Sequence, residues 1–198
     1  VAYGYYEFKK YILVAQKEQL EMSMYEKIGN DYKLILRNNV IVGENPGDKY
    51  TEGDKRTPEG AYELVEKKVG LDSFYGPLAL VTSYPNVFEQ SLDKKGSGIW
   101  IHGMPYYTDR EKFTKGCVAL DNTELENLEK KLDLNKTILL ISENTFKKAT
   151  KEEMALIFTS IYKWKDAWKY SNIEEYLSFY SKDFKRANKT GSGLFSEQ

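Results

Sequence analysis

Two short segments, residues 100–103 and 114–120, constrain this chain more than any other feature. They hold the only histidine, His102, and the only cysteine, Cys117, among 198 residues. Each of the two lies beside a glycine and next to an apolar run of the kind that forms a strand. We therefore expect one strand to end at His102 and ordered structure to resume directly after Cys117.

One cysteine with one histidine indicates nucleophilic catalysis, because a cysteine nucleophile needs a base and that base is most often histidine. The alternative is structural, since a lone cysteine is usually a small buried hydrophobic residue and a lone histidine a hydrogen-bonded one. The residues before the sulfur favour catalysis. Lys115 is a cation that stabilises a thiolate if it turns toward the sulfur, and Gly116 lets the backbone approach a substrate closely. The N–H groups of Gly116 and Cys117 are then natural donors to an oxyanion.

The composition excludes several kinds of partner. Hydrophobic residues make up 41% and charged residues 30%, and the formal net charge is −1. A charge so near zero gives no reason to expect a nucleic acid or an anionic membrane as partner. No apolar run approaches ~18 residues, so no transmembrane helix is expected. One cysteine excludes an internal disulfide, and one cysteine with one histidine is too few for a typical zinc site, so we expect neither a metal nor a cofactor.

Most of the chain up to residue 142 consists of short strand-like runs. Strands are predicted at residues 11–15, 20–25, 34–36, 40–42, 61–67, 78–83, 99–101, 118–120 and 137–142. The runs 34–36 and 40–42 are expected to form a pair joined by a turn at residues 37–39. Asp121, Asn122 and Thr123 are predicted to cap one helix at about residues 124–132. This content favours a β-sandwich with a helix packed on it.

The composition changes after Ser142, where helical spacing replaces strand patterns. Residues 150–170 are predicted to be a helix, because Thr150 and Glu153 match a capping box. Its apolar residues recur at helical spacing and include Trp164 and Trp168, which we expect to pack in a core. A second helix is predicted at residues 173–180.

The pattern around the cysteine resembles a known family. His102-Gly103, a spacer, and then Thr114-x-Gly-Cys-Val-x-Leu resembles the signature of the L,D-transpeptidase catalytic domain, also called the YkuD domain. Upstream, residues 53–60 (GDKRTPEG) are similar to the family's G-x-x-x-T-P-x-G segment. The resemblance covers roughly residues 10–142. It implies a mainly β fold, a sandwich with a packed helix.

A narrower resemblance concerns one branch of the family. Residues 76–80 and 84–86 are similar to the YafK-like branch, which includes cell-shape L,D-carboxypeptidases of curved and helical bacteria. In that group an NTF2-like domain follows the catalytic domain, and the helices after Ser142 resemble its opening. Such an α+β domain needs roughly 100 residues, so only part of it is represented. We expect a segment at 1–9, a catalytic domain at 10–145 and a partial NTF2-like domain at 146–198.

The family resemblance implies a mechanism and a substrate. Cys117 would attack a peptide carbonyl with His102 as base, and the backbone carbonyl of Gly103 would orient the imidazole. The partners would be peptidoglycan stem peptides, cut between an L-centre such as that of meso-diaminopimelate and a terminal D-Ala. A periplasmic location is implied by the family. No signal peptide is visible, and because the sequence begins at Val1 rather than methionine, we expect a leader or an N-terminal segment to have been removed.

Two departures from the family pattern bear on the reaction. Most members carry arginine two residues after the cysteine, where this chain has Ala119, and His or Arg before the Gly-Cys pair, where it has Lys115. The missing cation favours hydrolysis over cross-linking. The residues expected to contact substrate are Trp100, Tyr84, Asn86, Lys115 and Arg110. Trp100 lies two residues before His102 and therefore faces the same side of its strand, although a core position under the site is nearly as good an interpretation.

Three functional classes stay open. The first choice is an L,D-carboxypeptidase that converts stem tetrapeptides to tripeptides and thereby affects cell shape. The second is an L,D-transpeptidase or an L,D-amidase acting on meso-diaminopimelate linkages. A non-catalytic wall-binding module is third, because the presence of both a nucleophile and a base argues against it. The sequence leaves open whether the chain forms a homodimer.

Overall fold

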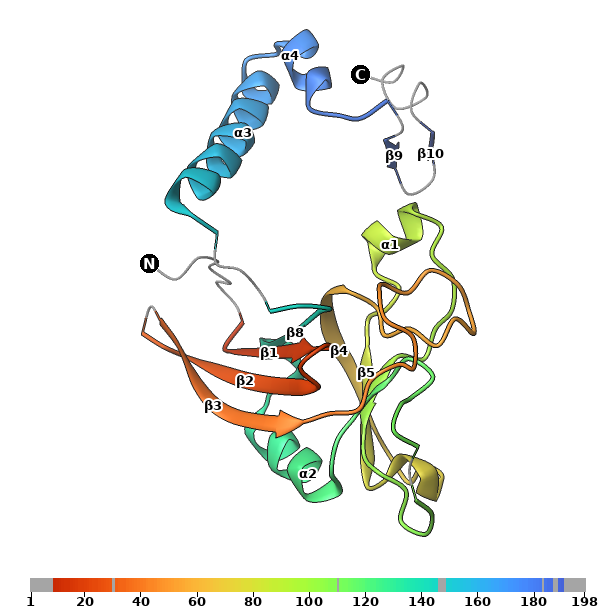
Figure 1. Cartoon of the computed structure of the whole chain (residues 1–198). Helices are drawn as coiled ribbons and strands as arrows, with labels where there is room; N and C mark the ends of the chain where they lie inside the picture. The colour runs from red at the N-terminus through yellow and green to blue at the C-terminus, as the bar shows by residue number, and fades with distance from the viewer. Residues whose placement is uncertain are drawn as a thin grey trace. The chain divides into compact units, whose positions relative to one another are not determined.

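The computed structural model describes residues 9–29, 31–109, 111–145, 149–182, 184–186 and 189–190 (Figure 1). The chain divides into two compact units, Val1–Phe146 and Lys147–Gln198. Among the described residues, no helix is both long and apolar enough to cross a membrane.

In the described part of the N-terminal unit, the strands form one curved eight-stranded sheet with the order β3-β2-β1-β8-β4-β5-β6-β7. The strands are β1 (Tyr11–Gln16), β2 (Glu21–Ile28), β3 (Asp31–Asn39), β4 (Gly60–Val69), β5 (Leu78–Thr82), β6 (Trp100–His102), β7 (Val118–Ala119) and β8 (Thr137–Ser142). Directly after β3, Ile41 forms an antiparallel bridge with Ala119 of β7. The two ends of the strand order are therefore linked, and the sheet curls around one core.

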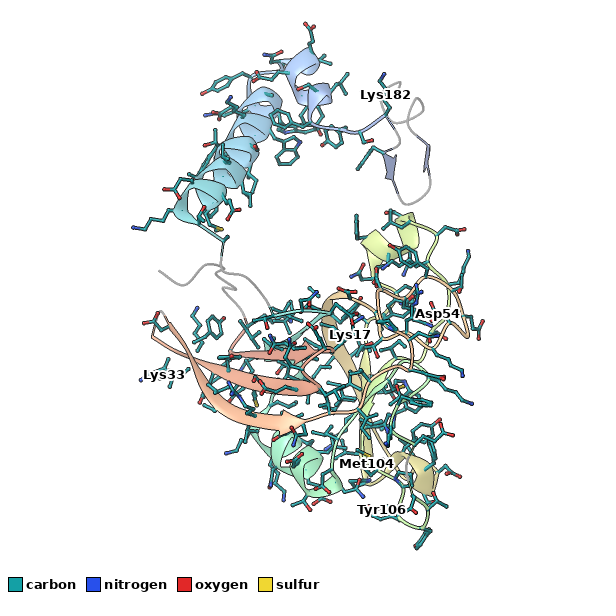
Figure 2. All side chains as sticks on the ribbon, viewed as in Figure 1. Lys17, Lys33, Asp54, Met104, Tyr106 and Lys182 are labelled. Atoms are coloured by element: carbon teal, nitrogen blue, oxygen red, sulfur yellow. The ribbon has the colours of Figure 1, made fainter. Side chains whose placement is uncertain are left out.

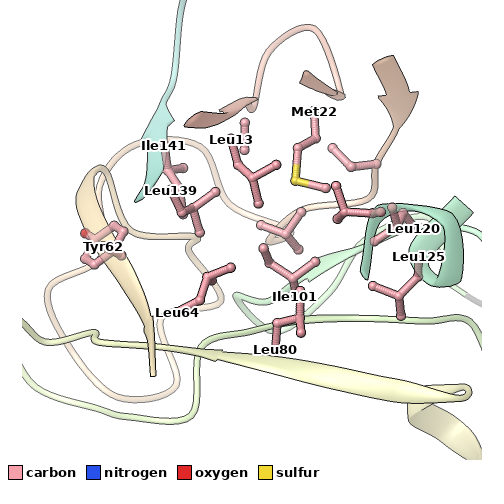
Figure 3. Close-up of a cluster of buried hydrophobic side chains, with 14 of the residues drawn as sticks. Leu13, Met22, Tyr62, Leu64, Leu80, Ile101, Leu120, Leu125, Leu139 and Ile141 are labelled. Atoms are coloured by element: carbon pink, nitrogen blue, oxygen red, sulfur yellow. The ribbon is translucent and has the colours of Figure 1, made fainter. Parts of the chain in front are cut away.

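Among the described residues of this unit, four helical elements accompany the sheet: η1 (Ser73–Tyr75), α1 (Val87–Ser91), α2 (Asn122–Lys131) and η2 (Leu134–Lys136). The α2 helix buries Leu125 and Leu128 in the core, and its amino end is capped by Asp121, whose carboxylate accepts from Thr123 N and Glu124 N. Figure 3 shows core side chains, among them Leu13, Leu80 and Leu125, meeting in one cluster. Its largest members are Leu13, Met22, Met24, Tyr62, Leu80, Ile101, Leu120, Leu125, Leu128, Leu139 and Ile141. Each fully buried leucine contributes about 1.5–3 kcal/mol.

The mainly β fold with a packed helix is confirmed, but one predicted hairpin is wrong. Residues 37–39 do not turn, because β3 continues through them to Asn39 and pairs with β2. The ladder places Asn38 opposite Met22, and Asn38 is buried. Backbone pairing with β2 therefore overrides the turn preference of two successive asparagines. Residues 40–42 contribute only the single bridge at Ile41.

The C-terminal unit contains α3 (Lys151–Lys169), α4 (Ile173–Ser178), β9 (Lys185–Arg186) and β10 (Lys189–Thr190). The predicted capping box at Thr150 and Glu153 is confirmed. The expectation that the two tryptophans pack in a core is wrong for the described residues, because Trp164 is 40% and Trp168 57% exposed. Both rings instead lie against Tyr176 of α4. In the described part of this unit, Ala167 is the buried apolar residue, so two helices alone do not enclose a core.

Candidate active site

The sheet brings the histidine and the cysteine segments side by side. β6 lies between β5 and β7, with His102 opposite Ala79 on one side and Ala119 on the other. β6 and β7 run parallel, and Cys117 directly precedes β7. Leu120 N–H also donates to the His102 carbonyl at 3.1 Å. His102 is 1% exposed, whereas Cys117 is half-buried.

The imidazole of His102 is held by a backbone carbonyl. Its Nδ1 lies 2.8 Å from the oxygen of Gly103. A carbonyl oxygen can only accept a hydrogen bond, so Nδ1 carries the proton in this contact and Nε2 is the basic nitrogen. The ring of Tyr75 packs edge-on against the imidazole, with 5.1 Å between centroids. This arrangement fixes both the tautomer and the plane of the imidazole.

The backbone around Gly103 is itself anchored on both sides. Gly103 N–H donates to Tyr75 O at 2.9 Å, and Met104 N–H donates to Asn122 Oδ1 at 2.7 Å. A Cβ on Gly103 would overlap with Asn122 Oδ1, and a Cβ on Gly76 would overlap with the same oxygen. Asn122 was expected to act as a helix cap, but Asp121 caps the helix and Asn122 turns to the site.

A buried threonine shapes the turn that carries the cysteine. Thr114 Oγ1 donates to Cys117 O at 2.7 Å and accepts from Gly116 N at 3.0 Å. Gly116 has φ of 132°, a conformation that favours glycine, and a Cβ there would lie 2.8 Å from Arg56 O. The Cys117 Sγ lies 3.5 Å from Gly98 O. The sequence-based prediction did not include Thr114 as a site residue, although a threonine hydroxyl is able to bond to the backbone two residues further on, as Thr114 does with Gly116 N.

The hydrogen bond to Thr114 bears on the expected oxyanion donors. The Gly116 N–H is engaged by the threonine hydroxyl. Of the two N–H groups expected to act as oxyanion donors, the Gly116 N–H is thus used within the turn, which leaves the Cys117 N–H as the candidate donor. Donors to an oxyanion must point at the developing charge rather than at a neighbouring side chain.

The segment 49–57, whose Arg56 carbonyl lies against Gly116, is held by many hydrogen bonds. Asp54 accepts hydrogen bonds from Lys49 Nζ at 2.6 Å and from the backbone N–H groups of Tyr50, Thr51 and Arg56. Burial acts to raise the pKa of Asp54, but these donors outweigh it and lower that pKa to about 2. Nearby, Thr57 Oγ1 accepts from Gly43 N at 2.8 Å.

A buried lysine ties this segment to the ends of two strands. Lys17, labelled in Figure 2, is 4% exposed, and its Nζ donates to Gly47 O at 2.7 Å and to Thr57 O at 3.1 Å. The same ammonium forms ion pairs with Glu59 and Glu143. Lys17 follows β1 and Glu143 follows β8, so the cluster fixes the segment to the edge of the core.

Two of the expected substrate contacts are structural residues. Tyr84 is 5% exposed, and its hydroxyl donates to Lys95 O at 3.1 Å. Asn86 is the N-cap of α1, where it accepts from Glu89 N and donates to Ala61 O. The structure therefore places Tyr84 in the core and Asn86 at a helix end, because a cap and a buried hydroxyl each use their polar atoms within the fold.

Two of the other expected contacts, Trp100 and Lys115, are accessible to solvent. Trp100 is half-buried and packs on Tyr75 at 5.2 Å between centroids. Since Tyr75 contacts both rings, Trp100 and His102 project from one face of β6. Lys115 is exposed on the loop before the cysteine. Arg110 lies outside the described residues. In the part of the chain that the structure describes, no group of three or more His, Cys, Asp or Glu side chains could hold a metal ion.

Comparison with protein families identifies two matching regions. Residues 9–141 match the model of the YkuD L,D-transpeptidase catalytic domain. Residues 156–198 match the model of the Cds6 C-terminal NTF2-like domain. The first match covers more than half of the chain and includes His102, Gly103 and Cys117.

Individual relatives agree with the family matches. The putative L,D-transpeptidase YafK of Escherichia coli is 26% identical over 113 residues, which are 57% of this chain and 43% of the relative. The chain thus spans less than half the length of this curated relative.

Two solved structures are similar over nearly the whole chain. The helical cell shape determining protein Pgp2 from Campylobacter jejuni matches with 34% identity and a TM-score of 0.87, over 98% of this chain and 69% of that one. Bd1075 from Bdellovibrio bacteriovorus matches with 30% identity and a TM-score of 0.76, over 94% and 68%.

Proposed function

Because the chain belongs to the L,D-transpeptidase (YkuD) catalytic-domain family, we propose that it is a peptidoglycan L,D-carboxypeptidase that removes the terminal D-Ala from stem tetrapeptides. The observation that carries this proposal is the Nδ1 contact of His102 with Gly103 O, beside the strand that follows Cys117. Such a contact leaves Nε2 as a base for a thiol. The similarity to Pgp2, a helical cell shape determining protein, supports a role in cell shape. The proposed location is periplasmic, where an enzyme of the L,D-transpeptidase family would meet peptidoglycan.

The proposed reaction uses a covalent intermediate. His102 Nε2 takes the proton of the Cys117 thiol, and the thiolate attacks the carbonyl carbon of the scissile peptide bond. The Cys117 N–H stabilises the resulting oxyanion. The imidazolium then gives its proton to the leaving amine of D-Ala, and a thioester remains. Water, deprotonated by His102, attacks the thioester and releases the tripeptide carboxylate and the thiol.

Two further residues are proposed to contact the substrate. Trp100 shares a face of β6 with His102 and would lie against the peptide on that side. Lys115, exposed directly before Gly116, would meet the carboxylate of the terminal residue.

The acceptor of the acyl group separates this proposal from its alternatives. Water gives a carboxypeptidase, and a second stem-peptide amine gives a transpeptidase. An amidase also transfers the acyl group to water, but it differs in its leaving group, because it cleaves a linkage at meso-diaminopimelate that attaches a protein to peptidoglycan. Ala119, where most family members carry arginine, is completely buried in β7 between β6 and Ile41. The site therefore has no cation at this position to order an acceptor peptide, which favours water.

Product analysis tests the proposal. The protein is incubated with purified disaccharide tetrapeptide and disaccharide pentapeptide, and products are followed by mass spectrometry beside Cys117→Ala. We expect disaccharide tripeptide from the tetrapeptide, absent in the variant. Cross-linked dimers would move the assignment to a transpeptidase. No Cys117-dependent product from either substrate would refute the proposed carboxypeptidase activity.

A further inference from the structure

The side chain of Asn122 makes a hydrogen bond that helix capping does not explain. It is the first residue of α2, but Asp121 already caps that helix through Thr123 N and Glu124 N. The Asn122 side chain instead accepts from Met104 N at 2.7 Å, two residues beyond His102. Met104, whose N–H is the donor in this hydrogen bond, is labelled in Figure 2.

The carboxamide oxygen of Asn122 is closely enclosed. A side chain on either Gly76 or Gly103 would overlap with it, and the same added atom on Gly103 would lie 2.9 Å from Pro77 Cδ and 3.1 Å from Gly76 Cα. The oxygen therefore has little freedom to move. Its hydrogen bond to Met104 N–H is fixed by packing as well as by polar attraction.

The bonded N–H belongs to the same peptide group as the carbonyl that holds His102. In a trans peptide the N–H and the C=O point in opposite directions within one plane. Asn122 Oδ1 fixes the N–H end of the Gly103–Met104 peptide, so the Gly103 oxygen at the other end is aimed at His102 Nδ1, 2.8 Å away. Hydrogen bonding at the N–H also polarises the peptide and makes its oxygen a stronger acceptor.

The geometry points to Asn122 as the positioning residue of the catalytic base, acting through the Gly103–Met104 peptide. By aiming the Gly103 carbonyl, Asn122 holds His102 in the tautomer with a basic Nε2 and favours the protonated imidazole that accompanies a thiolate. Tyr75 O, which accepts from Gly103 N at 2.9 Å, holds the preceding peptide in place. This inference rests on the proposed roles of His102 and Cys117, but not on the identity of the substrate.

The pH dependence of Cys117 alkylation tests the inference without any substrate. The rate of reaction with iodoacetamide is measured between pH 4 and pH 9 in the full chain and in Asn122→Leu, which keeps the shape but lacks the acceptor. We expect the apparent thiol pKa to rise by about one unit in the variant, so that about tenfold less thiolate is present at a pH below both values. Asn122→Asp keeps an acceptor oxygen and should not raise the thiol pKa.

Controls separate positioning from a general loss of stability. Asn127→Ala, on an exposed part of α2, and Asp121→Ala, which removes the cap, should leave the alkylation profile unchanged even where Asp121→Ala lowers the melting temperature. Asn122→Ala also lacks the acceptor, but it leaves a space where leucine would fill it. This variant replaces Asn122→Leu in the experiment if the leucine variant does not fold. A folded acceptor-free variant with the wild-type profile, or Asn122→Asp with the same defect as Asn122→Leu, would overturn the inference. Absence of carboxypeptidase product with a shifted alkylation profile would count against the proposed substrate alone.

Discussion

At the scale of single residues, side chains that form hydrogen bonds with the backbone determine the form of the site. Thr114 joins the Gly116 N–H to the Cys117 carbonyl through one hydroxyl. Asp54 collects three backbone donors and one ammonium in the segment whose Arg56 carbonyl lies against Gly116. Both residues satisfy backbone groups that a sharp turn leaves without strand or helix partners.

Replacing Thr114 tests the turn at the cysteine. Thr114→Val keeps the volume but removes the hydroxyl, which leaves a buried N–H and a carbonyl unsatisfied. We expect a loss of about 1–3 kcal/mol in the free energy of unfolding, together with slower alkylation of Cys117. Thr114→Ser retains the hydroxyl and is the matched control. Equal urea midpoints for the valine and serine variants would show that the hydroxyl has no structural role.

The low pKa of Asp54 predicts a pH-dependent contribution to stability. Burial opposes ionisation, but Lys49 and three backbone donors lower the folded-state pKa to about 2, from 3.8. A depressed pKa stabilises the folded state fully above the unfolded value, and this contribution is lost as the pH falls from about 4 to about 2. The difference in unfolding free energy between wild type and Asp54→Asn should be on the order of 1–2 kcal/mol at pH 6 and shrink toward pH 2.

Denaturation midpoints at several pH values measure this difference. Glu126→Gln, an exposed carboxylate on α2, is the control and should follow the wild type throughout. A gap between wild type and Asp54→Asn that is as wide at pH 2 as at pH 6 would contradict the expected titration.

At the scale of elements, α2 both covers the core and positions the site. Its inner face buries Leu125 and Leu128, while its first residue, Asn122, holds the backbone next to His102. The strands show the same combination, because the parallel pairing of β6 with β7 places the segments of His102 and Cys117 together as it builds the sheet. Substitutions of buried residues in these elements should therefore also alter the geometry around His102 and Cys117.

Leu125→Ala tests how strongly α2 is held. Leu125 is fully buried, so truncation should cost about 2–5 kcal/mol through lost burial and a residual cavity. Asn127→Ala, exposed on the same helix, should stay within about 0.5 kcal/mol of the wild type. Chemical denaturation followed by circular dichroism measures both. A loss below about 1 kcal/mol for Leu125→Ala would indicate that the helix is loosely packed.

At the scale of the whole molecule, the two units differ in how they bury apolar surface. The N-terminal unit closes one core with a sheet whose ends meet at Ile41 and Ala119. In the described part of the C-terminal unit, the apolar residues of α3 stay largely exposed, among them Trp168. The Lys17 cluster joins parts of the N-terminal unit that lie far apart in sequence.

Lys17→Met tests that long-range connection. Removing the ammonium leaves the carboxylates of Glu59 and Glu143 close together without a counter-charge, and leaves Gly47 O and Thr57 O without a donor. Breaking a buried ion pair typically costs about 3–5 kcal/mol. Because both carboxylates are partly exposed, we expect the free energy of unfolding to fall by less than this, by about 2 kcal/mol. The double variant Lys17→Met with Glu143→Gln should recover part of it. Unchanged stability of Lys17→Met would show that the cluster contributes nothing to the fold.

The sequence alone determined the chemical identity of the candidate site and most of the strands. One histidine and one cysteine left no competing candidates, and short apolar runs bounded by glycine and proline marked strands because a period of two follows from local backbone geometry. Tertiary structure alone decided which of the nearby polar residues serve the site. Tyr84 and Asn86 follow a strand as site residues often do, yet their polar atoms are used in the core and at a helix end.

Asn122 and Thr114 show the reverse case. Their residue types predict caps and turns, and only the packing of α2 and of the cysteine loop brings their oxygen atoms to the backbone beside His102 and Cys117. The same holds for residues 37–39, whose turn preference was overridden by pairing with β2. Local sequence determines what a residue can donate, accept or favour, whereas its partner is set by which distant segments the closed core brings within hydrogen-bonding distance.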